Sequence, residues 1–326
     1  MSQTYIAGPH RFELQEGWEQ RPEGWGHPDV TGVAVDKSDR VYLLVRAESP
    51  VVVYGPGGEF IRTWGKGEFV VPHGITIDAD ERVWIVDKGG HWVKIFDLEG
   101  SLLTTIGDGR PSETGIEGDF QTIKHGGPPF NEPTNVGFGP SGEAFIGDGY
   151  GNARIHRFDR EGNLELSWGE PGQGEGEFNV PHAVTVDDTG RVLVADREND
   201  RIQIFSSDGE VLDIWDDDIC RPDDLAIHDG ILYIVELGLY VGRYPGLRPD
   251  SPGDPASRIS LWTLSGELVG RWGTRDGCHP GSFHAPHGIA VDSRGDIYVT
   301  ECNWTGGGKD GQVPPTCHSV QKFARA

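Results

Sequence analysis

The chain reads Val71-Pro72-His73-Gly74-Ile75-Thr76-Ile77-Asp78 early in its 326 residues, and this stretch decides the fold. It recurs as Val180-Pro181-His182-Ala183-Val184-Thr185-Val186-Asp187 and as Ala285-Pro286-His287-Gly288-Ile289-Ala290-Val291-Asp292. Weaker copies begin at Pro28, Pro133 and Pro222, and the six prolines are 44, 61, 48, 41 and 64 residues apart. Repeats of this length are typical of four-stranded propeller blades, some with insertions, so six blades are predicted.

The residues after each copy follow one pattern. The turn at 187–190 leads to a β-branched strand at 192–196, a third strand at 201–205 and a Gly-bearing turn at 207–209. Apolar and polar residues alternate with a period of two between these turns, which is typical of antiparallel meanders and not of helices. The fold class predicted is therefore all-β, a six-bladed β-propeller.

The two ends of the chain are expected to meet in the last blade. That blade has only three strands by the C-terminus, the last at 320–323, while residues 11–14 resemble a missing fourth strand. Pairing the ends would remove an open sheet edge. We therefore predict a single propeller domain over residues 1–326, with an N-terminal strand closing the last blade.

Loops of a meander blade alternate between two faces of the propeller. Short turns form one face, and three long insertions at 108–132, 237–257 and 302–318 belong to the other. Functional loops gather on one side of a rigid scaffold, so the second face is expected to carry the function.

The Pro-His pairs lie on this second face, just before each innermost strand. His73, His182 and His287 fall in blades two, four and six, and Asp29, Asn135 and Asp223 stand near the matching position elsewhere. A lone histidine in a turn is usually structural, but three at equivalent positions of alternate blades would point at one axis. Neutral imidazoles suit zinc, and three ligands leave a position open for substrate. We predict a zinc site, with another divalent metal as the alternative.

Five blades place an acid at the end of the second strand. The simplest interpretation is that these carboxylates tether loops by hydrogen bonds. The acids are Asp87, Asp148, Asp196, Glu236 and Glu301.

Two further residues are candidates for chemistry. Blade one has Arg46 where the other blades have the acid, and a guanidinium there could clamp a carboxylate or form a plain salt bridge. Tyr150 follows the second strand of blade three. A phenol near a cation is more readily ionised and could act as a base, although packing is an alternative role.

Charge and composition exclude some functions. The net charge of −24 repels phosphate backbones, so nucleic acid is not an expected partner. Apolar runs are too short to span a bilayer, and no signal peptide is recognised at the start, so a cytoplasmic location without membrane contact is expected. Four cysteines are too few for a disulfide scaffold. Cys278, Cys302 and Cys317 lie near the last blade, where a local disulfide or a second metal site is open.

Several segments together resemble the lyase of the peptidylglycine α-amidating family. They end in Arg46 or span 71–78, 147–154 and 180–205, and they keep their order over most of the chain. The resemblance implies zinc held by His73, His182 and His287, a catalytic Tyr150 and a catalytic Arg46.

The resemblance also implies a reaction. That family splits N-acyl-α-hydroxyglycine, a carbinolamide, into a primary amide and glyoxylate without water or a redox cofactor. A zinc-dependent carbon–nitrogen lyase acting on a small carboxylate-bearing molecule is therefore expected, with Arg46 and Tyr150 contacting the substrate. Since no hydroxylating domain is recognised, a small metabolite could replace the peptide.

Two positions depart from the family pattern. Its structural calcium uses an acid directly after the last metal histidine, where this chain has Gly288, so calcium is not expected. Secreted members have a cysteine after the catalytic tyrosine, and this chain has Gly151.

Two other functions remain open. One is a metal-dependent propeller hydrolase of the lactonase kind, although such sites are rich in carboxylates. The other is a non-enzymatic NHL-repeat scaffold, which the Val-Pro-x-Gly-Ile stretches also resemble, but which gives no reason for histidine in alternate blades.

Overall fold

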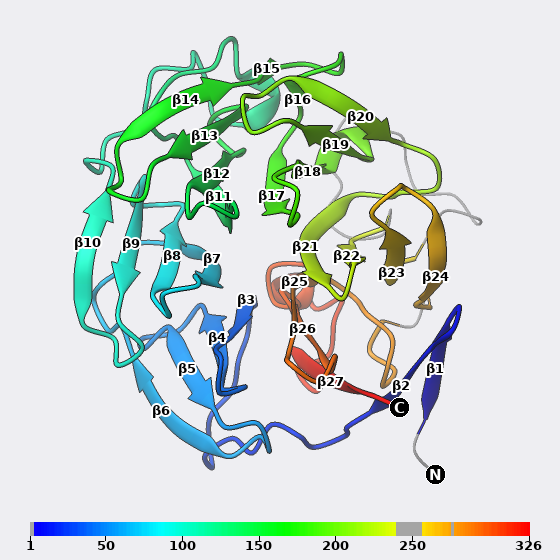
Figure 1. The fold of residues 1–326 in the computed structure, drawn as a ribbon. Coiled ribbons are helices and arrows are strands. Elements are labelled where there is room, and N and C mark those ends of the chain that lie inside the picture. Colours follow the sequence, from blue (N-terminus) through cyan, green and yellow to red (C-terminus); the bar gives the residue numbers. More distant parts are fainter. Residues whose placement is uncertain (1–2, 239–255, 275–276) are drawn as a thin grey trace. The chain divides into compact units, whose positions relative to one another are not determined.

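The computed structural model describes residues 3–238, 256–274 and 277–326. Its described residues form six antiparallel sheets of at least four strands, each a blade in which neighbouring strands pair, and 3₁₀ turns are the helical elements (Figure 1). This confirms the predicted class, an all-β six-bladed β-propeller. None of the described helical segments is long and apolar enough to cross a membrane.

The blades divide between two compact units. The central unit is Gly65–Pro222, and the terminal unit is Met1–Trp64 with Asp223–Ala326. The single propeller domain over residues 1–326 therefore stays a prediction.

The central unit holds blades two, three and four. Blade two is β7 (Pro72–Ile77), β8 (Val83–Asp87), β9 (Trp92–Phe96) and β10 (Leu102–Ile106). Blade three is β11 (Pro133–Phe138), β12 (Ala144–Asp148), β13 (Arg154–Phe158) and β14 (Leu164–Trp168). Blade four is β17 (Pro181–Val186), β18 (Val192–Asp196), β19 (Arg201–Phe205) and β20 (Val211–Trp215). Shorter elements are η1 (Phe120–Thr122), η2 (Arg197–Asn199) and the parallel pair β15 (Glu170–Pro171) and β16 (Glu177–Phe178).

The terminal unit holds blades one, five and six. Blade one is β3 (Val30–Val35), β4 (Val41–Val45), β5 (Val51–Tyr54) and β6 (Phe60–Trp64). Blade five is β21 (Pro222–His228), β22 (Ile231–Glu236), β23 (Arg258–Thr263) and β24 (Leu268–Trp272). Blade six is β25 (Pro286–Val291), β26 (Ile297–Glu301), β27 (Val320–Arg325), β2 (His10–Leu14) and β1 (Thr4–Ala7), with η3 (Gly308–Asp310) in its insertion.

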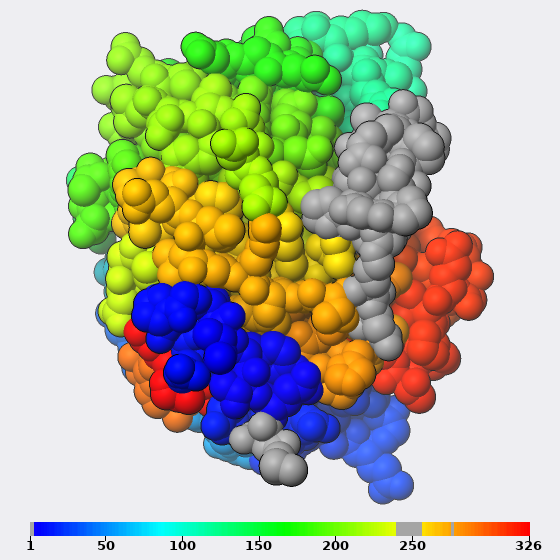
Figure 2. All heavy atoms as spheres, turned by 90° about the vertical axis from the view of Figure 1, so that its right-hand side faces the viewer, coloured from blue at the N-terminus to red at the C-terminus, as the bar shows by residue number. Residues whose placement is uncertain are grey.

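The N-terminal strand closes blade six as predicted. Strand β2 pairs with β27, with Phe12 opposite Arg325 and Leu14 opposite Phe323. The sequence did not indicate the outer strand β1, which pairs with β2 and carries Tyr5. Tyr5 Oη donates to Pro280 O at 3.0 Å, and Figure 2 shows these N-terminal strands, in blue, beside the orange segment that includes β24.

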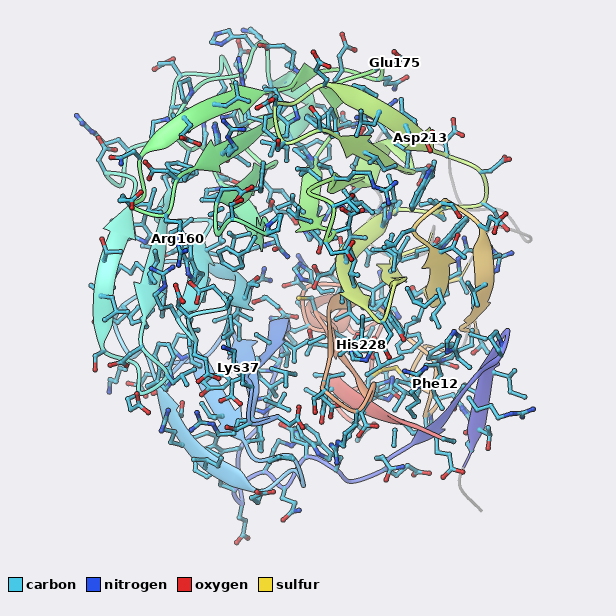
Figure 3. The ribbon with its side chains drawn as sticks, viewed as in Figure 1. Phe12, Lys37, Arg160, Glu175, Asp213 and His228 are labelled. Atoms are coloured by element: carbon cyan, nitrogen blue, oxygen red, sulfur yellow. A yellow bond between two sulfur atoms is a disulfide. The ribbon has the colours of Figure 1, made fainter. Side chains whose placement is uncertain are left out.

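Aromatic rings pack against one another where β2 completes blade six. Phe12, labelled in Figure 3, is fully buried. Its ring centroid lies 5.4 Å from the ring centroid of Trp272. Trp272 lies 5.5 Å from Phe323 of β27. Burying one such ring stabilises the fold by about 2–3 kcal/mol, so the blade built from both chain ends is a packed sheet and not a frayed edge.

The cysteines and insertions add local structure. Cys278 and Cys317 form a disulfide, which decides the alternative that the sequence left open, while Cys220 and Cys302 are buried and belong to no disulfide. Of the insertion at 237–257, residues 239–255 lie outside the described residues.

Candidate active site

Each of the three predicted ligands sits at a β-bulge. In β7, Pro72 pairs with Asp87 and Gly74 with Val86, so His73 is the extra residue. The same shift falls at His182 in β17 and at His287 in β25. A bulge re-aims the side chain of its extra residue, and such bulges are common beside functional sites.

The equivalent bulges of blades one and three carry threonines. Register shifts fall at Thr31 in β3 and at Thr134 in β11. The sequence comparison placed Asp29 and Asn135 near this position, and they lie two residues and one residue from the bulges. The comparison aligns the proline near the start of each innermost strand. In blade one this alignment is displaced, because Pro28 lies before β3 begins at Val30.

The threonine carbonyls fix two of the imidazoles. His73 Nδ1 lies 2.9 Å from Thr134 O, and His287 Nδ1 lies 2.8 Å from Thr31 O. A carbonyl oxygen can only accept a hydrogen bond, so each Nδ1 is the donor and carries the hydrogen. Each Nε2 of the neutral ring then keeps its lone pair. This second-sphere arrangement is the one that metal-binding histidines generally show.

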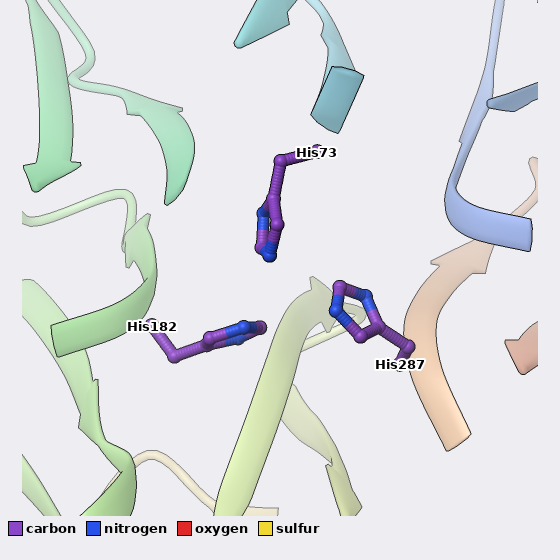
Figure 4. Close-up of side chains that lie close together, drawn as sticks. All are labelled: His73, His182 and His287. Atoms are coloured by element: carbon purple, nitrogen blue, oxygen red, sulfur yellow. The ribbon is translucent and has the colours of Figure 1, made fainter. Parts of the chain in front are cut away.

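The central unit brings two of the predicted ligands together. His73 and His182 have ring centroids 4.9 Å apart, and ligand nitrogens of the pair lie within 4.8 Å. Both side chains are almost fully buried. His287 belongs to the terminal unit, where its Nε2 lies 4.0 Å from Asp223 Oδ2, and Figure 4 draws the three side chains.

Tyr150 joins the histidine pair. Its Oη lies 2.9 Å from His182 Nε2 and 3.4 Å from His73 Nε2. Arg197 Nη1 donates to the same oxygen at 3.0 Å, and Lys88 Nζ lies 3.8 Å from the centroid of the ring. The phenol oxygen thus lies beside two imidazoles and one guanidinium, and an ammonium group lies over the ring.

The sequence analysis assigned no role to Arg197 and Lys88. Lys88 directly follows Asp87, and Arg197 directly follows Asp196, so both take the position after the loop-tethering acid. A basic residue at this repeated position in two blades was the signal that could have identified them.

A buried acid holds Arg197 in place. Glu198 Oε1 accepts from Arg197 Nε at 2.9 Å and from Arg221 Nη2 at 2.9 Å. Burial alone would raise the pKa of Glu198, but the two guanidinium charges outweigh burial and lower it. The carboxylate therefore stays charged between the arginines and orients the one that meets Tyr150.

Arg46 lies in the terminal unit just after β4. Its Nη1 donates to Asp29 Oδ2 at 3.2 Å and to Thr305 Oγ1 at 3.0 Å. Its Nε is buried and has no hydrogen-bond partner among the described residues. The salt bridge that the sequence left open is present, and the carboxylate clamp stays a prediction.

Four of the acids that end the second strands tether loops, as the simplest interpretation predicted, whereas Glu236 accepts from Arg258 and Ser260 of β23. Asp87 accepts from the backbone of Val70 and Val71, at 2.7 and 2.8 Å, and Glu301 accepts from the backbone just before β25. Asp196 accepts from Asn179 N at 2.7 Å. Burial raises the pKa of Asp196 to about 6, although these hydrogen bonds oppose it. The four acids thus fix the segments that lead into the innermost strands.

Comparison with known proteins gives the family. The NHL repeat pattern matches residues 69–96, 178–205 and 283–304, the three parts that contain the Pro-His pairs. NHL repeat-containing protein 3 of Mus musculus is 33% identical over 309 residues, which cover 89% of this chain and 81% of that protein. The fold and site define an NHL-repeat propeller, and the chain belongs to the family that includes NHL repeat-containing protein 3.

Lyases are also among its relatives. Peptidyl-alpha-hydroxyglycine alpha-amidating lyase 1 of Drosophila melanogaster is 32% identical over 278 residues, which cover 78% of this chain and 47% of that protein. Peptidylglycine alpha-amidating monooxygenase of Rattus norvegicus is 36% identical over 339 residues, which cover 88% of this chain and 32% of that protein. The chain spans less than half the length of these two relatives.

Solved structures agree on the fold alone. A streptogramin B lyase superposes with a TM-score of 0.62 at 14% identity, over 99% of this chain and all of that one. A gluconolactonase from Xanthomonas campestris gives 0.62 at 12% identity, over 98% and 91%.

Proposed function

We propose that the chain is a metal-dependent lyase that cleaves the carbon–nitrogen bond of an N-acyl-α-hydroxyglycine-like carbinolamide, giving an amide and glyoxylate. The observation that carries this proposal is the phenol of Tyr150, 2.9 Å from His182 and 3.0 Å from Arg197. The amidating lyases among the relatives support the same reaction class. The expected partner is a small carboxylate-bearing substrate.

The proposed metal ligands are His73, His182 and His287, with zinc as the ion. The donor set fits, because the Nδ1 atoms of His73 and His287 face backbone carbonyls and keep Nε2 available. In a six-bladed propeller the innermost strands line one channel, which is why His287 of β25 is proposed to complete the set. A zinc ion bound there would act as a Lewis acid toward the substrate hydroxyl.

The protein's own residues would move the proton and hold the substrate. Tyr150, which contacts Arg197 through its oxygen and Lys88 through its ring, would act as the base that takes the hydroxyl proton of the substrate. The electrons of that O–H bond form the carbonyl of glyoxylate as the C–N bond breaks, and the proton that Tyr150 has taken is passed to the amide nitrogen, which restores the base. Arg46 would bind the substrate carboxylate through guanidinium N–H groups, in keeping with the preference of arginine for carboxylates.

A direct assay tests this function. The purified protein is loaded with zinc, its metal content is measured, and α-hydroxyhippurate is supplied while glyoxylate and benzamide are quantified. We expect about one zinc per chain and equal amounts of the two products. Failure with several carbinolamides at full metal loading would reject the lyase, and absence of tightly bound metal would favour a non-enzymatic scaffold.

A further inference from the structure

A cavity of about 460 Å³ lies within the terminal unit, and its lining does not include His73, His182 or His287. It is formed by the segment that leads into β3 and by the insertion of blade six. Its lining includes Arg21, His27, Asn303, Trp304, Val313 and Pro314. Cavities of this size are typical of sites for small organic ligands.

Asn303, one of the residues that line the cavity, has a buried acceptor for which the described residues supply no donor. Asn303 is 5% exposed, and its Nδ2 donates to His318 O and Cys317 Sγ. Because Nδ2 is committed to these two acceptors, the other amide atom is the oxygen. That atom, Oδ1, is buried and has no hydrogen-bond partner among the described residues. A buried acceptor is rarely left unpaired, so the site is suited to a ligand that brings an N–H group.

The other walls combine polar residues with apolar ones, and Arg21 is the arginine among them. Trp304 is 53% exposed, although it belongs to a cavity wall that also includes Val313 and Pro314. Arg21 is bound through Nε to Glu19 at 3.4 Å, and within the described residues its remaining nitrogens have no partner. An exposed indole beside prolines offers a stacking surface for a ring, and a guanidinium offers donors to a carbonyl.

The same short segment borders the candidate substrate clamp. Trp304 N donates to Pro28 O at 3.1 Å, and Thr305 N donates to Asp29 Oδ1 at 3.0 Å. Thr305 Oγ1 in turn accepts from Arg46. A cavity wall and the partner of Arg46 are therefore consecutive residues.

We propose that this cavity is a specificity subsite for an apolar side chain and its amide N–H in the acyl part of the substrate. The N–H would donate to Asn303 Oδ1, the apolar group would lie on Trp304, and Arg21 would donate to an acyl carbonyl. The substrate carboxylate would reach Arg46 beyond Thr305. The inference rests on the proposed lyase function for the kind of substrate, while the cavity itself belongs to the described residues.

Two unreactive glycine analogues test the subsite without turnover. Dissociation constants of N-acetyl-Phe-Gly and N-acetyl-Ala-Gly are measured by calorimetry with the metal-loaded protein. The probes share a backbone and differ by a phenyl group, so we expect the phenylalanine probe to bind about 10-fold tighter or more. Trp304→Ala should reduce this ratio to below about 3-fold, because the stacking surface is lost.

A second variant isolates the polar contact. Asn303→Leu should weaken both probes by about 10-fold and keep their ratio, because both carry the N–H group. Leu212→Ala is the matched control, since Leu212 is also 53% exposed but lies on β20 of the central unit. Thermal unfolding shows whether each variant is folded.

The outcomes separate this inference from the proposed function. Equal affinity of the wild type for both probes, or a ratio that Trp304→Ala leaves intact, would overturn the subsite even if glyoxylate is produced. Loss of selectivity in the variant supports the subsite even if no carbinolamide is cleaved. With reactive hydroxyglycine substrates, Trp304→Ala should raise KM for the phenylalanine compound while kcat stays within about 2-fold.

Discussion

Arg197 donates a hydrogen bond to the phenol oxygen of Tyr150 at 3.0 Å, and its guanidinium carbon lies 5.3 Å from the centroid of the tyrosine ring. The same arginine is held from behind by Glu198. One cation therefore contacts both the oxygen and the ring of the residue proposed as the base. The contact joins blades three and four within the central unit.

The contact predicts that Arg197 contributes to turnover. Arg197→Met keeps much of the side-chain volume but removes the donor and the charge, so kcat should fall by about 10- to 1000-fold. The loss should appear in kcat more than in KM, because Arg197 contacts the proposed base and not the substrate. Arg191→Met is the control, since Arg191 bridges Asp187 on the same blade and is partly exposed. A kcat of Arg197→Met within about 2-fold of the wild-type value would separate this arginine from the base.

Tyr150→Phe tests the base itself. The ring contacts with Lys88 and Arg197 would remain, but the oxygen that takes the proton would be gone. We expect turnover to fall by about 100- to 10,000-fold, with metal content and unfolding temperature unchanged. Glyoxylate release and metal analysis on the same preparation check this. Near-normal turnover would remove Tyr150 from the mechanism.

Sequence patterns predicted the fold because blades repeat. Proline and alternating apolar residues recur at each innermost strand, and Arg11–Leu14 matched a missing strand by the same alternation. The acids were recognised because they recur too.

Features that depend on register or on distant contacts were not predictable. The bulges at Thr31 and Thr134 have no sequence signature beyond the histidines of other blades, so the sequence indicated only residues close to them. The contact of Arg197 with Tyr150 joins residues 47 apart, and the pairing of Cys278 with Cys317 depends on how the insertion folds back. Strand β1 is short and half exposed, with too little alternation to be recognised.

Metal binding should depend on His182. His182→Ala removes one of three proposed ligands, so the zinc content should fall from about one per chain to below about 0.2 after dialysis. The fold should persist, because the bulge is defined by backbone pairing. His125→Ala is the control, since this exposed side chain bonds only to Gly126 O among the described residues. Zinc retained by His182→Ala would contradict the ligand set.

The disulfide between Cys278 and Cys317 should stabilise the terminal unit. It links residues 39 apart, and closing a loop of that length in the unfolded chain is worth about 2–4 kcal/mol. The double variant Cys278→Ala with Cys317→Ala should lower the free energy of unfolding by that amount, and reductant should do the same to the wild type only. Urea unfolding with and without reductant measures both.

The disulfide also bears on location. Such bonds persist mainly in oxidising compartments, and the predicted cytoplasmic location would expose this one to cellular reductants. In the unfolding experiments Cys220→Ala is the matched control, because Cys220 belongs to no disulfide. If reductant lowered the stability of the double variant as much as that of the wild type, the disulfide would not be the stabilising bond.

The ion pair between His318 and Glu301 predicts how stability changes with pH. Their side-chain atoms lie 3.0 Å apart, and Glu301 also accepts from His284 N before β25. Burial alone would lower the pKa of His318, but the bond and charge of Glu301, with Ser282 O, raise it above 6.5. The folded protein therefore holds this proton more tightly than the unfolded chain. The stabilisation is complete below about pH 6.5 and is lost as pH rises through the folded pKa.

The free energy of unfolding, measured in urea from about pH 6 to 9, should fall more steeply in the wild type than in His318→Gln, which keeps a donor but cannot titrate. His279→Gln, at an exposed histidine of the same unit, should keep the wild-type slope. Equal slopes in the wild type and His318→Gln would show that the proton is not retained, and the pair would then be a neutral hydrogen bond.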